Sequence, residues 1–221
     1  MSCNEWKEYS LDEICDIRRG ASPRPIINYI SENGIPWVKI ADATSANSRY
    51  INETKEFIIK EGKSKSVYVN KGDFILSNSA TPGIPKFMGI SACIHDGWLL
   101  LNNFRNCSKM FIYYKLVNDR EKLLSNANGS VFKNLKTDIV KNHKIKLPSL
   151  DEQQKIANIL SSLDDKIELN NEMNKTLEEI AQSIFKRWFI DFEFTNENGE
   201  PYKSSGGEMV DSELGMIPKG W

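Results

Sequence analysis

The sequence has little that would place it in a membrane or outside the cell. Its longest apolar runs are far too short to cross a bilayer, and the first residues, Met1 to Glu5, do not resemble a signal peptide. The four cysteines lie at positions 3, 15, 93 and 107 and form no CxxC pair. Because unpaired cysteines are typical of a reducing compartment, the sequence predicts a cytoplasmic protein without a membrane segment.

Residues typical of catalysis or metal binding are also scarce. His95 and His143 are the only histidines, so a zinc site is not expected. The chain lacks a GxxxxGK[ST] phosphate-binding loop, and it lacks the FxGxG and Asn-Pro-Pro-aromatic motifs of DNA methyltransferases. We therefore predict no catalytic residue, no metal and no cofactor on this chain, and we favour a binding role.

One weak signal for catalysis remains. Glu61 and Lys63 form the E-x-K fragment found in many metal-dependent nucleases, and Asp42 is a possible upstream carboxylate. The fragment lies among several lysines, however, and charge runs of this kind are usually solvated surface. A free-standing nuclease is the less favoured alternative, and it requires that Glu61→Ala abolish any cleavage.

Charge is abundant and unevenly divided along the chain. Residues 1–150 carry 22 Lys and Arg against 15 Asp and Glu, a net charge of +7. Residues 151–221 carry 7 against 15, a net charge of −8. Parts of opposite charge usually serve different partners, so the sequence indicates a polyanion as the partner of the first part.

The first 148 residues alternate short strand-like segments with a few helical ones, which predicts an α+β fold with a mixed sheet. Strands are expected at 6–11, 34–40, 66–69, 74–77, 88–94, 97–101 and 143–147, and helices at 109–125 and 133–140. Arg18 to Pro25 is expected to form a rigid basic loop, and 78–86 a polar loop.

Basic and short polar residues of this part are candidate contacts for nucleic acid. An Asn side chain hydrogen-bonds well to adenine, and Lys or Arg binds guanine or phosphate. The start of a helix also favours phosphate. Each residue could instead be an ordinary turn-former or a solvated charge. The candidate set is Arg19, Arg24, Lys39, Ser77, Asn78, Ser79, Lys86, Ser130, Lys133 and Asn134.

The stretch from Ser149 to Phe194 contains no Gly and no Pro. Ser149 is a candidate cap with Glu152 three residues later, which predicts a helix of roughly 40 residues, ~60 Å long. Steps of three and four give a heptad seam, indicating a coiled-coil arm rather than an ordinary core helix. Two central Asn would set the register of an antiparallel pair. The seam consists of Ile156, Leu160, Leu163, Ile167, Asn170, Asn174, Leu177, Ala181, Ile184 and Trp188.

Several segments resemble the specificity subunits of Type I restriction–modification systems. Leu147 to Ala157 is similar to the L-P-x-L-x-E-Q-x-x-I-A segment of that family, and Phe185 to Phe192 resembles the segment that closes the same helix. Looser similarities to the recognition domain occur at 34–40, 72–77 and 129–135. Asn78 to Gly83 departs from the Gly-rich turn that the family usually has after the position of Leu76.

The resemblance implies a DNA target recognition domain at 1–148 and a coiled-coil helix at 149–194 for dimerisation and methyltransferase docking. Residues 195–221 resemble the start of a second recognition domain, in which Trp221 would correspond to Trp6. The resemblance therefore implies a half-length subunit. Such a chain directs methyltransferase and restriction subunits to a bipartite site on double-stranded DNA. S-adenosylmethionine, ATP and Mg are then expected on the partner subunits only. A homodimeric coiled-coil DNA-binding regulator unrelated to restriction is the alternative.

Overall fold

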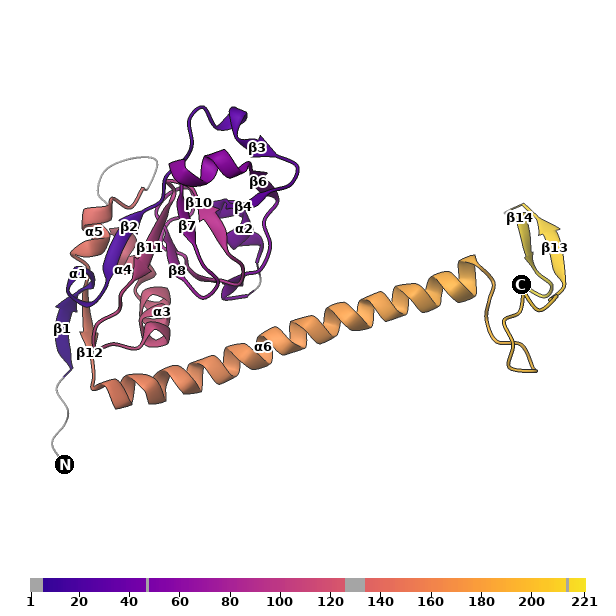
Figure 1. Cartoon of the computed structure of the whole chain (residues 1–221). Coiled ribbons are helices and arrows are strands. Elements are labelled where there is room, and N and C mark those ends of the chain that lie inside the picture. The colour runs from indigo at the N-terminus through magenta and orange to yellow at the C-terminus, as the bar shows by residue number, and fades with distance from the viewer. Residues whose placement is uncertain (1–5, 47, 126–133, 214) are drawn as a thin grey trace. The chain divides into compact units, whose positions relative to one another are not determined.

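The computed structural model describes residues 6–46, 48–125, 134–213 and 215–221. The chain forms two compact units, one ending at Asp165 and the other beginning at Lys166 (Figure 1). The predicted α+β class is confirmed. None of the helices in the described ranges is long and apolar enough to span a membrane.

The first unit contains two five-stranded mixed sheets, ordered β3-β6-β4-β10-β7 and β2-β11-β8-β9-β5, and a β1-β12 pair. Its strands are β1 (Lys7–Ser10), β2 (Asp16–Arg19), β3 (Ile30–Ser31), β4 (Ile35–Val38), β5 (Tyr50–Ile51), β6 (Glu56–Ile58), β7 (Val67–Val69), β8 (Phe74–Ser77), β9 (Pro85–Met88), β10 (Ala92–Ile94), β11 (Trp98–Asn102) and β12 (Lys144–Leu147). Its helices are α1 (Leu11–Ile14), η1 (Ile26–Asn28), α2 (Ile40–Ser45), η2 (Lys60–Lys65), α3 (Lys109–Asn118), α4 (Arg120–Ser125) and α5 (Thr137–Lys141).

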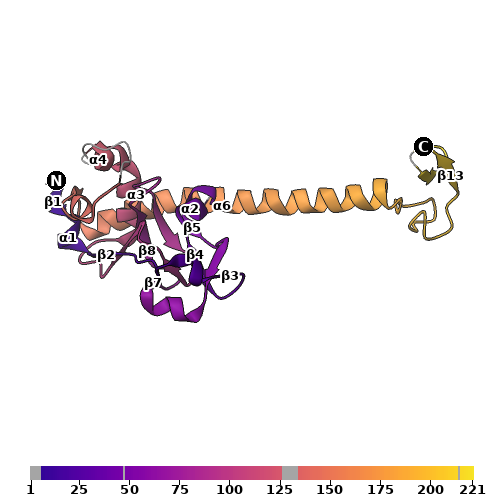
Figure 2. The same cartoon turned by 90° about the horizontal axis from the view of Figure 1, so that it is seen from above.

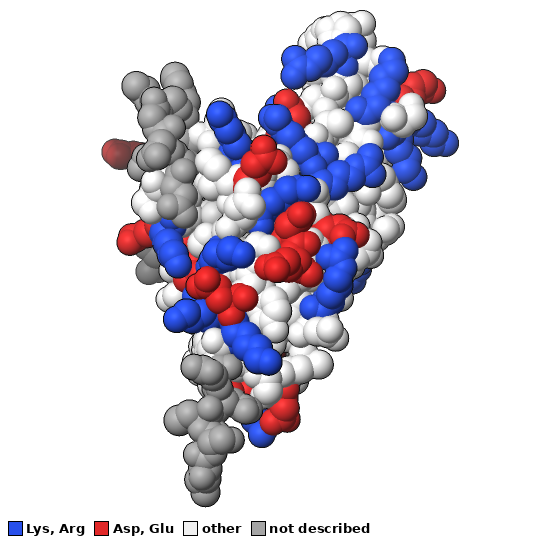
Figure 3. Space-filling model, turned by 90° about the vertical axis from the view of Figure 1, so that its left-hand side faces the viewer, with Lys and Arg blue, Asp and Glu red and all other residues white. Residues whose placement is uncertain are grey.

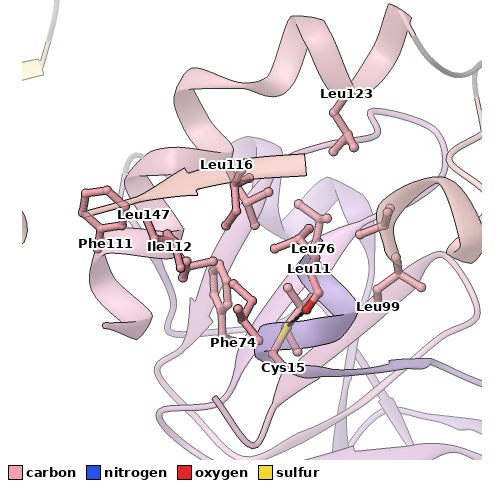
Figure 4. Close-up of a cluster of buried hydrophobic side chains, with 14 of the residues drawn as sticks. Leu11, Cys15, Phe74, Leu76, Leu99, Phe111, Ile112, Leu116, Leu123 and Leu147 are labelled. Carbon is pink, nitrogen blue, oxygen red and sulfur yellow. Dashed lines mark hydrogen bonds between the residues drawn. The ribbon is translucent and has the colours of Figure 1, made fainter. Parts of the chain in front are cut away.

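Strand β8 is buried on both faces, which explains its apolar run from Phe74 to Leu76. Successive side chains of a strand point to opposite sides, so Phe74 and Leu76 join one core cluster while Ile75 joins another. The neighbouring strand β11 is divided between the clusters in the same way. Figure 4 shows Ile112 and Leu116 of α3 meeting the β8 side chains in the first cluster.

Several predicted elements need correction. The predicted helix 109–125 is two helices, because the chain turns at the buried Asp119 between α3 and α4. Pro85 and Lys86, expected in the polar loop, begin strand β9, which pairs with both β8 and β5. The strand expected at 88–94 is divided between the end of β9 and β10. The predicted basic loop begins as strand β2, where Arg18 pairs with Leu100. Helix α2 was not predicted, and the helix expected at 133–140 is the shorter α5.

His143 is the buried partner of Asp119. Its Nε2 lies 3.3 Å from Asp119 Oδ2, while Lys115 Nζ donates to Asp119 Oδ1 at 2.7 Å. Burial lowers the pKa of His143, and the Asp119 hydrogen bond only partly opposes it. Burial likewise lowers the pKa of His95. Both imidazoles therefore gain a proton less readily than an exposed histidine does.

We expect thermal stability to fall as the pH drops below 6.5, the ordinary pKa of histidine. The unfolded chain then binds protons more readily than the folded one, so stability is complete above 6.5 and is lost below it. Unfolding midpoints measured at pH 7.5 and 5.5 check this expectation. Within that pH range, His143→Gln should reduce the drop, and equal midpoints for the unchanged chain would contradict the interpretation.

Helix α6 (Leu150–Phe185) confirms the predicted long helix, and a π-helical turn, η3 (Lys186–Ile190), follows it. The first turns of α6, as far as Asp165, belong to the first unit. Buried Gln153 accepts from Ser108 N at 3.0 Å and donates to Pro148 O at 3.0 Å, and Ala157 is fully buried. Figures 1 and 2 both show α3 alongside these turns. The predicted boundary between 148 and 149 stays a prediction, and the compact unit extends to Asp165.

The predicted seam of α6 divides into two parts. Ile156 and Leu160 are half-buried, and Ile156 packs on the core of its own domain. Periodicity does not distinguish an internal contact from an external one, so the assignment of Ile156 to a partner helix stays a prediction. The exposed large apolar residues of α6 are Leu150, Ile159, Leu163, Ile167, Leu169, Met173, Leu177, Ile180, Ile184 and Phe185.

The second unit ends in a hairpin of β13 (Met209–Ser212) and β14 (Gly215–Pro218). The Trp221 ring stacks on Phe194 with 5.5 Å between centroids, and Phe194 stacks on Tyr202 at 4.7 Å. Phe189 of η3 also lies 5.5 Å from Trp221. These aromatic contacts join η3, Phe194 and Tyr202 to the end of the second unit at Trp221.

Candidate nucleic-acid interface

Residues 18–71, here called the basic segment, hold ten Lys and Arg against five Asp and Glu. Figure 3 shows Lys and Arg side chains gathered toward the top of the molecule, where Figure 1 places β3 and β6. Lys63 lies over the Tyr68 ring at 3.7 Å, and Lys65 over the Tyr29 ring at 4.8 Å. Aromatic faces therefore hold these two ammonium groups at the surface.

A pocket of about 740 Å³ lies beside the basic segment, and we name it the Arg24 pocket. It brings together Arg24, Lys39 and Ser79, three predicted contact residues that are far apart in the sequence. Trp37 and His95 also line it, and their rings lie 6.1 Å apart. Prolines and small apolar side chains complete its wall, so the pocket combines an apolar floor with cationic groups.

The turn between β10 and β11 forms one side of this pocket. A Cβ at Gly20 would lie 2.1 Å from His95 O, so only glycine permits the chain after β2 to approach this turn. Gly20 N donates to Trp98 O at 2.8 Å and fixes that approach. As a result Ser22, two residues later, reaches Asp96 across the turn.

Asp96 is the polar centre of the turn. Ser22 Oγ donates to its Oδ1 at 2.6 Å, and the guanidinium Nη2 atoms of Arg24 and Arg19 lie 3.5 Å and 3.9 Å from its Oδ2. Arg19 Nε also donates to the Asp96 backbone carbonyl at 2.8 Å. The Ser22 hydrogen bond is the main reason that the pKa of Asp96 lies below its usual value. Asp96 is not among the residues predicted from the sequence, because an Asp-Gly pair between strands is an ordinary turn signal.

His95 is neutral beside this carboxylate. Burial is the main reason that its pKa is lowered, and Asp96 acts in the opposite direction. Its Nδ1 accepts a hydrogen bond from Gly97 N at 2.8 Å, so the ring proton sits on Nε2. The pocket wall therefore contains a neutral imidazole rather than a third cation.

Three of the predicted contact residues are buried and serve the fold instead. Lys86 is 8% exposed, and its ammonium group donates to Ala46 O at 3.0 Å and to Ser48 O. Ser77 donates to Thr81 O at 2.7 Å within the turn after β8. Asn78 is buried as well. Buried side chains do not reach a duplex, so these assignments are corrected.

The remaining predicted residues differ in position. Lys39 pairs with Glu56 at the rim of the Arg24 pocket. Asn134 is exposed near α5. Ser130 and Lys133 lie outside the described residues.

The nuclease alternative gains no support from the geometry. Asp42 accepts hydrogen bonds from the backbone N–H of Lys39 at 2.8 Å and of Lys55 at 3.4 Å, so it caps α2. Glu61 lies on η2, and Lys63 covers Tyr68. Within 6–46, 48–125, 134–213 and 215–221, no group of three or more His, Cys, Asp or Glu could hold a metal ion.

Comparisons with known proteins agree with one another. The family model described as "Type I restriction modification DNA specificity domain" matches residues 4–179. The specificity subunit of Type I restriction enzyme MjaIX from Methanocaldococcus jannaschii is 30% identical, over 98% of this chain and 50% of its own length. The specificity subunit of Type I restriction enzyme HindI from Haemophilus influenzae is 29% identical, over 97% of this chain and 47% of its own length. The chain thus spans about half the length of these curated relatives.

Solved structures show the same fold. The HsdS subunit from Thermoanaerobacter tengcongensis aligns with a TM-score of 0.58 and 20% identity, covering 86% of this chain and 45% of that one. The Type I restriction–modification S subunit from M. genitalium aligns with a TM-score of 0.60 and 19% identity, covering 84% and 47%. Both alignments support the α+β architecture and the long helix described above.

Proposed function

Because the chain belongs to the family of Type I restriction–modification DNA specificity domains, we propose that it binds double-stranded DNA and confers sequence specificity on a restriction–modification complex. The observation that carries this proposal is the family match, which runs from the first strand of the recognition fold into α6. The basic segment supplies the electrostatic attraction that a DNA backbone requires. The free cysteines at 15, 93 and 107 are consistent with action in a reducing cytoplasm.

We assign no catalytic step to this chain. Methyl transfer and cleavage belong to methyltransferase and restriction subunits, which would carry S-adenosylmethionine, ATP and Mg. In support, Asp42, one of the two carboxylates of the nuclease alternative, is occupied in capping α2. The role of this chain is then to place those subunits on the target.

The exposed apolar stripe of α6 is the proposed contact with a second copy of the chain. Leu163, Ile167, Leu177 and Ile184 are all exposed, and a stripe of this length is stable in water only when covered. Asn170 and Asn174 lie between them and would set register. We propose that the methyltransferase subunits dock on the same helical region.

Co-purification separates this proposal from a homodimeric DNA-binding regulator. A tagged full chain expressed with a Type I methyltransferase subunit should retain that subunit through a salt wash. The variant Gln153→Ala, which loses the hydrogen bonds to Ser108 and Pro148, should retain less. A chain that binds its DNA target but never retains a methyltransferase subunit would favour the regulator.

DNA affinity should decrease steeply as salt rises, because each neutralised phosphate releases counterions. Lys63→Ala and Lys65→Ala should each make the slope of log K against log salt shallower by about one unit. Lys133→Ala carries the same expectation from the sequence. Fluorescence anisotropy over a salt series measures the slope.

Lys86→Ala is the matched control for the salt series. Because Lys86 is buried and bonded to two carbonyl groups, its removal should lower stability and leave the slope unchanged. An affinity independent of salt would contradict this mode of contact for the whole basic segment.

A further inference from the structure

Arg24 is an exposed arginine with a fixed carboxylate neighbour. Its side chain is 80% exposed, and its Nη2 lies 3.5 Å from Asp96 Oδ2. Asp96 is itself immobilised by Ser22, by the β10–β11 turn and by Arg19, whose Nε bonds to the Asp96 carbonyl. The guanidinium group is therefore tethered on one edge, while its other edge faces solvent beside the Arg24 pocket.

This arrangement is poorly suited to a phosphate. The ionised Asp96 cancels part of the positive charge of Arg24 and would repel a nearby phosphate oxygen. A contact that needs only positive charge is served better by Lys63 or Lys65, which stand over aromatic rings. The Asp96 carboxylate favours binding only where the ligand requires a particular orientation of the Arg24 guanidinium.

Orientation matters when arginine reads a base. The planar guanidinium donates two parallel hydrogen bonds to guanine O6 and N7. An untethered arginine loses rotamer freedom on making them, and a pre-oriented one loses less. A carboxylate that holds one edge leaves the other edge for the base.

We propose that Arg24 reads a guanine in the target DNA and that Asp96 is its positioning residue. This inference rests on the proposed function and deepens it by naming a base and the residue that selects it. Arg19 and Ser22 act through Asp96 by keeping the turn in place. The Arg24 pocket then lies beside the base edge of this guanine, which carries O6 and N7.

The test is selection of bound sequences from a randomised duplex library by the full chain, compared with Arg24→Lys and Asp96→Asn. We expect both variants to lose preference for one G·C pair, on the order of tenfold to a hundredfold, and to keep their preferences elsewhere. Arg24→Lys retains the charge, so its salt slope should match that of the unchanged chain. Ser22→Ala should give an intermediate loss at the same pair.

Asp16→Asn is the matched control. Asp16 holds Arg105 and Asn103 at the opposite end of β2, so it is an equivalent Asp–Arg pair away from the pocket. This variant should keep the full sequence preference. Circular dichroism and thermal melting confirm that all variants are folded.

Two outcomes would overturn the inference while leaving the proposed function intact. One is an unchanged preference in Arg24→Lys and Asp96→Asn. The other is an equal loss at every position, which would make Arg24 a backbone contact. An unchanged chain without any sequence preference would overturn the proposed function, and this inference with it.

Discussion

Methylation-site mapping with this chain as the only specificity subunit should return a split palindrome, two identical inverted blocks around an unread spacer. Two copies paired antiparallel through α6 have two-fold symmetry, and two-fold protein symmetry imposes the same symmetry on the DNA that is read. We expect the base contacts to lie in residues 1–148 of each copy, so both blocks should be read by identical residues. One continuous block, or two different half-sites, would refute the symmetric pair.

The palindrome depends on the exposed stripe of α6. Replacing Leu163 and Leu177 by Asp should weaken self-association more than about a hundredfold, because each buried Leu contributes roughly 1.5–3 kcal/mol. Sedimentation at tens of micromolar, on the order of ordinary dimer affinities, measures the effect. A monomeric unchanged chain at that concentration would contradict the model.

Aspartates on the outer face of α6 control for added charge. Lys175 and Gln182 lie five residues after seam positions 170 and 177, on the side facing away from the seam. Lys175→Asp with Gln182→Asp should leave self-association and the mapped target unchanged. Removing one heptad, 166–172, shortens the helix by about 10 Å and should shorten the spacer without changing either block.

Arg49→Ala should lower the free energy of unfolding of the first unit by about 2–4 kcal/mol. The Arg49 side chain is 5% exposed; it pairs with Asp165 and lies 3.4 Å from both Tyr114 Oη and Ser161 O. Tyr114 in turn donates to Asp164 at 2.7 Å. Because Asp165 is 64% exposed, we place the effect below that of a fully buried pair.

These contacts join α6 to the recognition domain, so their loss should also be visible in the target. We expect the spacer mapped for Arg49→Ala to become variable in length while both blocks persist. Urea unfolding measures the stability change.

Arg49→Met tests whether charge or volume is responsible. An apolar side chain of similar size should recover part of the loss, because it refills the space without a buried charge. Arg105→Ala removes an exposed Arg–Asp pair and should change stability little. An Arg49→Ala chain that unfolds at the same urea concentration as the unchanged chain would show that the Arg49 contacts do not stabilise the attachment of α6.

Local sequence determined the elements whose signals depend only on neighbouring residues. Helix α6 follows from a stretch without Gly or Pro and from its cap, in which Ser149 Oγ accepts from Glu152 N at 3.3 Å. Strand β8 follows from a short apolar run between turn residues. Helix and strand periodicities are properties of consecutive residues, and for this reason the α+β class and the long arm were predictable.

Tertiary structure alone decided which face met which partner. The same periodicity placed Ile156 and Leu163 on one seam, yet Ile156 packs on its own domain while Leu163 is exposed. Lys86 was predicted as a DNA contact because it is a basic residue in a polar segment, but the pairing of β9 with β8 and β5 buries it. Asp96 and Arg24 are 72 positions apart, and only the close approach at Gly20 brings them together. Contacts at such separations depend on how sheets cross and how closely backbones approach, and no window of sequence contains that information.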